Sequence, residues 1–216
     1  MQVFVETERL ALRRFMEADV DHLFALHNDP DVMRSLNGGR PTPHEETERE
    51  YQERFRVDGY WAAVEKATGA FLGWFAFHPT QGRDLDEVEL GYRLMRSAWG
   101  KGYATEGSRA LIRKGFTELG VRRVWAQTMA VNLASRRVME KAGLAYVRTL
   151  RLEWEAPLPG AGHGEVEYAL TKADWEWRQA AVRGRPRTST SDSALEPTAT
   201  GAGEATSPNT TNRAAR

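Results

Sequence analysis

The clearest chemical signal in the chain lies in residues 95–107, which read MRSAWGKGYATEG. The stretch follows a predicted strand and opens a predicted helix. A glycine-rich turn at a helix start lets backbone N–H groups approach an anion closely, and the helix dipole adds about half a positive charge there. Residues of these types in this order predict a site for a phosphate or pyrophosphate group.

Two common nucleotide motifs do not fit this stretch. A Rossmann fingerprint needs a third glycine where Thr105 stands, and an acidic residue about 20 positions further on, where residues 126–128 read AQT. A Walker loop needs Gly-Lys followed by Ser or Thr, whereas Gly102 follows Lys101 here. A nucleotide-binding protein of another fold is therefore the weaker alternative, and an acyl-coenzyme-A site is the third interpretation.

Three further segments lead to a family resemblance. Residues 132–144 read NLASRRVMEKAGL, residues 90–94 read LGYRL, and residues 7–10 read TERL. Together with the glycine-rich stretch, they resemble the GNAT superfamily of N-acetyltransferases over about residues 6–175. The most similar branch is the ribosomal-protein-alanine N-acetyltransferase group (RimJ/RimL-like). The paired motifs at this spacing are more specific than the Gly-Lys-Gly turn alone.

The resemblance implies an α/β (α+β) fold with a twisted mixed central sheet and flanking helices. The strands expected at residues 87–95 and 123–128 would splay apart, and acetyl-CoA would insert between them. Backbone amides of the glycine-rich turn would cradle its pyrophosphate, and backbone groups at the end of the first strand would pair with its pantetheine arm. The cofactor-binding residues implied in this way are Leu94, Met95, Arg96, Gly100, Lys101, Gly102, Tyr103, Ala104 and Asn132.

Acetyl transfer to an amine needs the neutral amine and a group that takes its proton. At pH 7 deprotonation costs about 4.6 kcal/mol for a lysine amine and about 1 to 1.4 kcal/mol for an α-amine. Glu89 is the first candidate base, because alternation places Glu87, Glu89 and Gly91 on one face of their strand. A carboxylate partly buried in a cleft is expected to have a raised pKa, as a general base needs. The alternative is that both glutamates are surface charges; His78, at a strand end facing a loop, is a second candidate.

The leaving thiolate needs a proton donor. Many members of the superfamily that the chain resembles use a tyrosine seven residues after the asparagine, but Met139 stands there. The ribosomal-protein branch has a serine three residues after the asparagine, and Ser135 matches it. The resemblance therefore implies Ser135 as the acid or sulfur hydrogen-bond donor. The alternative is a serine that satisfies backbone N–H groups in the first turn of its helix.

Hydrophobic periodicity predicts the elements that must position these residues. The order is an antiparallel run of strands followed by strand–helix–strand units. A capping box at Thr42–Glu45, with Pro43 as first helical residue, predicts a helix start, and Gly143 predicts a helix end. Strands are expected at 10–14, 60–65, 71–78, 87–95, 123–128, 144–154 and 165–170, and helices at 18–27, 43–55, 103–119, 133–142 and 172–181.

Composition bounds the function classes. The 216 residues include no cysteine, and 30 basic residues balance 30 acidic ones. Disulfides, thiolate metal sites and cysteine nucleophiles are therefore excluded, and bulk charge favours neither nucleic acid nor a membrane surface as partner. The histidines form no zinc-type pair, so no metal is expected. Residues 186–216, rich in Thr, Ser and Ala, are expected to be a disordered tail after one domain at 1–185.

The leading hypothesis is an acetyl-CoA-dependent N-acetyltransferase acting on a primary amine, either a protein N-terminus or a small molecule. Without a cysteine, direct attack in a ternary complex is the expected mechanism. The alternative is a non-catalytic acyl-CoA-binding regulatory module. The N-terminus does not read as a signal peptide, so a cytoplasmic protein is expected; a homodimer is common in the family that the chain resembles.

Overall fold

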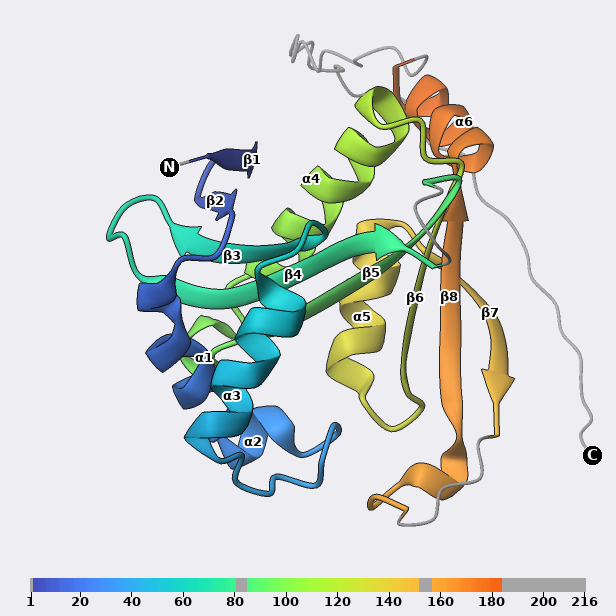
Figure 1. The fold of residues 1–216 in the computed structure, drawn as a ribbon. Helices are drawn as coiled ribbons and strands as arrows, with labels where there is room; N and C mark the ends of the chain where they lie inside the picture. Colours follow the sequence, from blue (N-terminus) through green and yellow to red (C-terminus); the bar gives the residue numbers. More distant parts are fainter. Residues whose placement is uncertain (1, 81–84, 152–156, 184–216) are drawn as a thin grey trace, which may run out of the picture.

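The computed structural model describes residues 2–80, 85–151 and 157–183, and within them one eight-stranded sheet has the order β1-β2-β3-β4-β5-β6-β8-β7 (Figure 1). The strands are β1 (Val3–Glu6), β2 (Leu10–Arg13), β3 (Tyr60–Glu65), β4 (Phe71–Pro79), β5 (Glu87–Leu94), β6 (Arg123–Met129), β7 (Ala145–Leu150) and β8 (Glu165–Thr171). The helices are η1 (Glu17–Asp19), α1 (Val20–His27), α2 (Pro30–Met33), α3 (His44–Glu50), the π-helix η2 (Tyr51–Phe55), η3 (Arg96–Ala98), α4 (Tyr103–Glu118), α5 (Leu133–Ala142), η4 (Ala161–His163) and α6 (Lys172–Arg183).

The functionally important irregularity is the junction of β5 and β6. These neighbours are parallel, whereas the other strand pairs are antiparallel. Their register covers only Glu87–Arg123, Val88–Val124 and Glu89–Trp125. Beyond these pairs the two strands diverge, as Figure 1 shows. We call the opening between residues 90–94 and residues 126–129 the β5–β6 fork.

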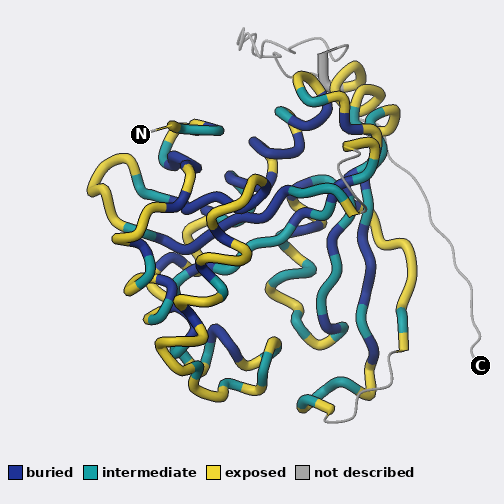
Figure 2. The backbone as a smooth tube through the Cα atoms, viewed as in Figure 1, coloured by how far each residue is buried: buried dark blue, intermediate teal, exposed yellow. Residues whose placement is uncertain are grey.

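Helices cover the two faces of the sheet differently. On one face α4 and α5 pack on a core that includes Phe75, Phe77 and Leu90. On the other face α1–α3 and η2 pack on a second core around Phe55 and Trp74. Figure 2 shows the central strands as mostly buried, while β7 is mostly exposed. The fork therefore lies between a sheet half covered on both faces and a thinner half formed by β6, β8 and β7.

Close approach of α4 to the sheet depends on two residues that have no side chain, Gly107 and Gly115. A Cβ added at Gly107 would lie 2.3 Å from Cζ of Phe75. A real Cβ does not come so near to a ring atom, so any larger residue would push the helix away from β4. The first turn of α4 is thereby held tightly against the strands that form the fork.

Most predicted elements are confirmed, and the Gly143 cap is confirmed with φ of 104°. The capping box is wrong by one residue, because α3 begins at His44 after Pro43 and has no side-chain cap. Thr42 is instead tied to the end of α1, where Asn28 accepts from its N–H at 3.0 Å and donates to its carbonyl at 2.9 Å. Strand β1 and the short helix α2 were not predicted.

The prediction of a tail at 186–216 lies outside the described residues. No helix in the described part of the chain is long and apolar enough to cross a membrane.

Candidate active site

Backbone groups of β5 face the fork at alternate residues. The N–H of Met95 donates to Leu72 O at 2.8 Å, and that of Thr80 donates to Glu87 O at 3.1 Å. Because hydrogen-bonded pairs alternate in an antiparallel ladder, odd-numbered residues of β5 bond to β4 and even-numbered ones face the fork. Of the two positions predicted to pair with pantetheine, Leu94 therefore faces the fork, whereas the N–H of Met95 is bonded to β4.

The glycine-rich turn connects the end of β5 to α4 in the way that an anion cradle requires. Gly100 and Gly102 have φ of 72° and 84°, a region that disfavours other residues. Nothing lies within 4 Å of a Cβ built on Gly100, so the backbone there is open. Trp99 closes the turn by donating its indole N–H to Leu94 O at 2.8 Å. The amides at the start of α4 can thus meet a phosphate.

An N-terminal clamp fixes the first turn of α4. Thr7 Oγ1 donates to Glu106 at 2.6 Å, and the N–H of Arg9 donates to it at 3.0 Å. The Arg9 guanidinium binds Glu106 at 2.5 Å and Lys101 O at 3.0 Å. Burial raises the pKa of Glu106, but the bonds from Thr7 and Arg9 outweigh it and leave that pKa below its usual value. These contacts give the TERL segment at residues 7–10 a structural role, because they anchor the glycine-rich turn to the start of β2.

Other predicted cofactor residues have contacts within the protein. The Arg96 guanidinium pairs with Asp31 at 2.5 Å, which links η3 to α2. Asn132 caps α5 by accepting from the Ser135 N–H at 3.2 Å, so its oxygen is engaged, while its amide N–H groups have no hydrogen-bond partner among the described residues. The Tyr103 hydroxyl donates to Glu65.

The Ser135 side chain meets a residue that the sequence reasoning missed. The hydroxyl of Tyr92 lies 2.9 Å from Ser135 Oγ and donates to Ser135 O at 3.0 Å. Tyr92 comes from β5 and Ser135 from α5, so the pair joins the two elements behind the fork. Burial raises the pKa of Tyr92 to about 12, with the Ser135 hydrogen bond opposing it. The phenol is therefore a neutral proton donor at pH 7.

Alternation along β5 could have revealed Tyr92, because it places this residue on the face of Val88 and Leu90, toward α5. Met139 is 2% exposed and belongs to the core. Met139 therefore packs in the core at the position where a tyrosine could donate a proton to the leaving thiolate.

Glu89 lies on the opposite face of β5, across from His78 of β4. The carboxylate of Glu89 is 4.0 Å from His78 Nε2, and the Tyr60 hydroxyl lies 3.2 Å from the same nitrogen. The prediction of His78 at the end of a strand is confirmed to within one residue, because β4 extends through Pro79 and pairs His78 with Glu89. Its Nδ1 lies 3.2 Å from Pro79 O, which favours the tautomer with a lone pair on Nε2.

The two glutamates of β5 have different surroundings. Glu87 forms an ion pair with Arg123, which also binds Glu167 at 2.7 Å. Within the described chain Glu89 has no lysine or arginine partner, and its side chain is 39% exposed. The Glu87 carboxylate is thus engaged in an ion pair, while the Glu89 carboxylate is partly exposed.

No group of three His, Asp or Glu side chains in the described ranges is arranged to hold a metal ion. The unpaired fork edge of β5 and the open turn at Gly100 fit the pantetheine and phosphates of coenzyme A. The site thus combines a glycine-rich turn that can bind a coenzyme, the Glu89 carboxylate on one face of β5, and the hydroxyls of Tyr92 and Ser135 on the other face.

Comparison with known proteins decides the family. Residues 9–145 match the Acetyltransferase (GNAT) domain. The chain belongs to the GNAT family of acetyltransferases. It is an enzyme, an acetyl-CoA-dependent N-acetyltransferase.

One relative and two solved structures show how similar the chain is to known proteins. The chain is 34% identical over 184 residues to the FsC-acetyl coenzyme A-N(2)-transacetylase of Aspergillus fumigatus, covering 81% of this chain and 78% of the relative. A GNAT-family acetyltransferase structure from Bacillus anthracis superposes with a TM-score of 0.69 at 25% identity, covering 78% of this chain and 98% of that one. The ribosomal-protein acetyltransferase RimL in complex with coenzyme A gives 0.65 at 20% identity, covering 79% and 98%. The last similarity concerns the fold alone.

Proposed function

We propose that this N-acetyltransferase acetylates a primary amine by direct attack, with Glu89 as base and Ser135, supported by Tyr92, as proton donor. The observation that carries the proposal is the placement of Glu89 and Tyr92 on opposite faces of β5, beside the fork. Glu89 faces away from α5, and Tyr92 reaches Ser135 on α5 at 2.9 Å. An amine and a thioester sulfur meeting at the fork would then have a proton acceptor on one side and a donor on the other.

The proposed reaction transfers one acetyl group from sulfur to nitrogen. The ammonium form of the acceptor loses one proton to Glu89, directly or through a water; the neutral nitrogen then forms a bond to the thioester carbon, and its second proton passes to solvent as the amide forms. A backbone N–H of the fork edge, near Leu94, stabilises the oxyanion that develops. The C–S bond then breaks, and the thiolate takes a proton from Ser135, which recovers it through Tyr92 and solvent. His78, beside Glu89, can receive the amine proton from the carboxylate.

The cradle supplies the coenzyme contacts. Amides of residues 100–104 would bind the pyrophosphate, and the fork edge of β5 would bind the pantetheine arm. Arg96 and Asn132 are proposed to contribute less through their side chains, because both already have partners. Asn132 keeps two amide N–H groups for the coenzyme.

We infer that the acceptor is a small molecule with an α-type amine. The support is the 34% identity, over most of the chain, to a protein named as an N(2)-transacetylase. Such an amine is also cheaper to deprotonate than a lysine side chain, by about 3 kcal/mol at pH 7. The RimJ/RimL-like assignment implies a protein N-terminus instead, and both acceptor classes belong in the test.

The test is turnover with an amine panel. Purified protein is incubated with acetyl-CoA and with α-amines, polyamines or short peptides, and free thiol release and product mass are followed. Acetylation of small α-amines above peptides supports the proposal. Faster acetylation of peptide N-termini would overturn the acceptor class. Binding of acetyl-CoA without turnover on any amine would overturn the catalytic assignment of Glu89 and Ser135.

A further inference from the structure

Arg93 lies on the same face of β5 as Glu89 and is a largely buried cation without a hydrogen-bond or ion-pair partner among the described residues. Its guanidinium carbon lies 5.0 Å from the ring centroid of Trp74, which is itself 5% exposed. Its Nε is fully buried and has no hydrogen-bond partner. Among the described residues Arg93 makes no hydrogen bond through its side chain and no ion pair. Five N–H donors are therefore held in place while none is used.

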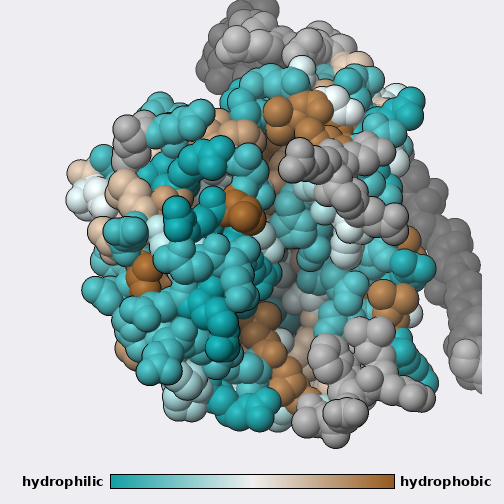
Figure 3. Space-filling view, in the orientation of Figure 1, coloured by the Kyte–Doolittle hydropathy of each residue, from teal (hydrophilic) through white to brown (hydrophobic). Residues whose placement is uncertain are grey.

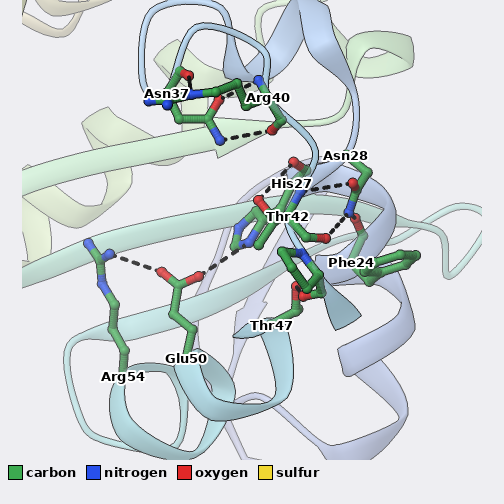
Figure 4. A network of polar contacts seen from close by, with 10 residues as sticks. Phe24, His27, Asn28, Asn37, Arg40, Thr42, Thr47, Glu50 and Arg54 are labelled. Carbon is green, nitrogen blue, oxygen red and sulfur yellow. Dashed lines mark hydrogen bonds and ion pairs between the residues drawn. The ribbon is translucent and has the colours of Figure 1, made fainter. Parts of the chain in front are cut away.

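The nearby carboxylate does not neutralise this charge. Glu50 of α3 attracts Arg93 electrostatically, yet its oxygens are engaged elsewhere. One lies 3.3 Å from His27 Nδ1 and the other 3.1 Å from Arg54 Nη1, as Figure 4 shows. Arg54 adds a second positive charge close to Arg93.

Burial is the main cause that lowers the pKa of Arg93, to about 10, so the group stays charged at neutral pH. Removing an unpaired cation from water costs several kcal/mol. A protein retains such a charge most readily where a ligand supplies the missing anion.

The position of Arg93 relative to Glu89 points to the acceptor. Glu89, Gly91 and Arg93 are alternate residues of β5 and share one face. Glu89 and Arg93 are four residues apart, so their Cα atoms are separated by about 13 Å. Gly91 between them has no side chain, and a Cβ added there would lie 3.2 Å from the Ala76 Cβ and 3.7 Å from the Trp74 ring.

One face of the molecule is hollowed. Figure 3 shows a hollow between the half of the molecule that carries α1–α3 and the half that carries β6 and β8. Arg93 is partly accessible as a residue, and its Nε is buried. An acceptor lying over Gly91 would thus have a carboxylate at one end and a guanidinium at the other.

We propose that Arg93 binds an anionic group of the acceptor, so that the enzyme acetylates amines that carry a carboxylate several atoms from the nitrogen. This rests on the proposed function, in which Glu89 faces the amine. A guanidinium binds a carboxylate through two parallel N–H···O bonds, a geometry that a lysine cannot reproduce. The Trp74 ring, 5.0 Å from the guanidinium carbon, makes a cation–π contact that favours the position of the group over the ring.

The test compares matched acceptors in matched variants. Each amino acid whose carboxylate lies several atoms from the acetylated nitrogen is paired with the carboxamide of that carboxylate, which keeps the amine and removes the negative charge. The native enzyme is expected to show a KM at least about 10-fold lower for the better acids than for their amides, since a charged hydrogen bond contributes about 1.5–3 kcal/mol. Arg93→Gln should abolish this difference and leave the KM for acetyl-CoA within about twofold.

Two further variants separate binding from folding. Arg93→Lys keeps the charge and should retain part of the preference for acids. Arg14→Gln removes an exposed arginine that pairs with Asp58 and should change neither KM. Thermal unfolding of all variants controls for structural loss.

Several results would overturn the assignment. Equal KM values for acids and amides in the native enzyme would do so, and so would a rise confined to the KM for acetyl-CoA in Arg93→Gln. Calorimetry of amino acids with the coenzyme A complex tests Arg93 without turnover. Binding of acids that Arg93→Gln abolishes would support the assignment even if no amine were acetylated, whereas that lack of acetylation would overturn the proposed function alone.

Discussion

Tyr92→Phe tests whether the hydroxyl pair behind the fork acts as one unit. The substitution removes an oxygen that lies 2.9 Å from Ser135 Oγ and 3.0 Å from Ser135 O, and leaves the ring in its place. One ordinary hydrogen bond contributes about 0.5–1.5 kcal/mol. If that energy orders the Ser135 hydroxyl in the transition state, kcat falls by about 2- to 13-fold.

Ser135→Ala should cost more, because it removes the donor itself and general acids contribute about 100-fold or more. In the double variant the Ser135 hydroxyl is absent, so the Tyr92 hydroxyl has nothing to position. Its loss should therefore lower kcat by less than a further factor of two. The assay is kcat by thiol release for the native enzyme, both single variants and the double variant, with the KM for acetyl-CoA as control. Two results would show that the hydroxyls of Tyr92 and Ser135 do not act as one unit: full activity of Tyr92→Phe, or a kcat of the double variant reduced by the product of the two single reductions.

Two other predictions concern the elements that hold the cradle. Gly107→Ala should lower the free energy of unfolding by about 1–3 kcal/mol, because its Cβ would lie 2.3 Å from Phe75; urea unfolding measures this, and an unchanged midpoint would contradict the close packing. Glu106→Gln should be less stable than the native protein at pH 7, because hydrogen bonds from Thr7 and Arg9 keep the pKa of Glu106 below its usual value. Since the ionised form carries that stability, the difference should persist above the ordinary glutamate pKa of about 4.3 and shrink as pH falls through the lower folded value; a difference that does not depend on pH would exclude the clamp as its source.

Local sequence patterns were sufficient to predict much of the fold. Period-two alternation located β5 and the shared face of Glu89 and Gly91. The Gly143 cap located the end of α5. The capping box failed because Asn28, far away in the sequence, competes for Thr42. Local propensity does not include such a long-range contact.

The candidate site was predicted only in part, for the same reason. The residues that contact Glu89 and Ser135 come from other elements: His78 lies across a strand pair, and Tyr92 lies across the helix–sheet interface. Arg93 could be seen as an arginine, but its lack of a partner depends on how α3 engages Glu50. Alternation along β5 places Tyr92 on the α5 face, and His78 is a candidate from the sequence, but the contacts that these residues make arise from tertiary packing and have no signal in a single sequence.

Glu89→Gln is the measurement that tests the central claim most directly, because it keeps the size of the side chain and removes its capacity to accept a proton. If Glu89 is the base, the kcat of Glu89→Gln should be lower by about 100-fold or more, and the Kd for acetyl-CoA measured by calorimetry should be unchanged. The rate of the variant should recover in part at higher pH, where more of the amine is already neutral. A kcat within about twofold of the native value at pH 7, measured with the same acceptor, would contradict the assignment of Glu89 as the base.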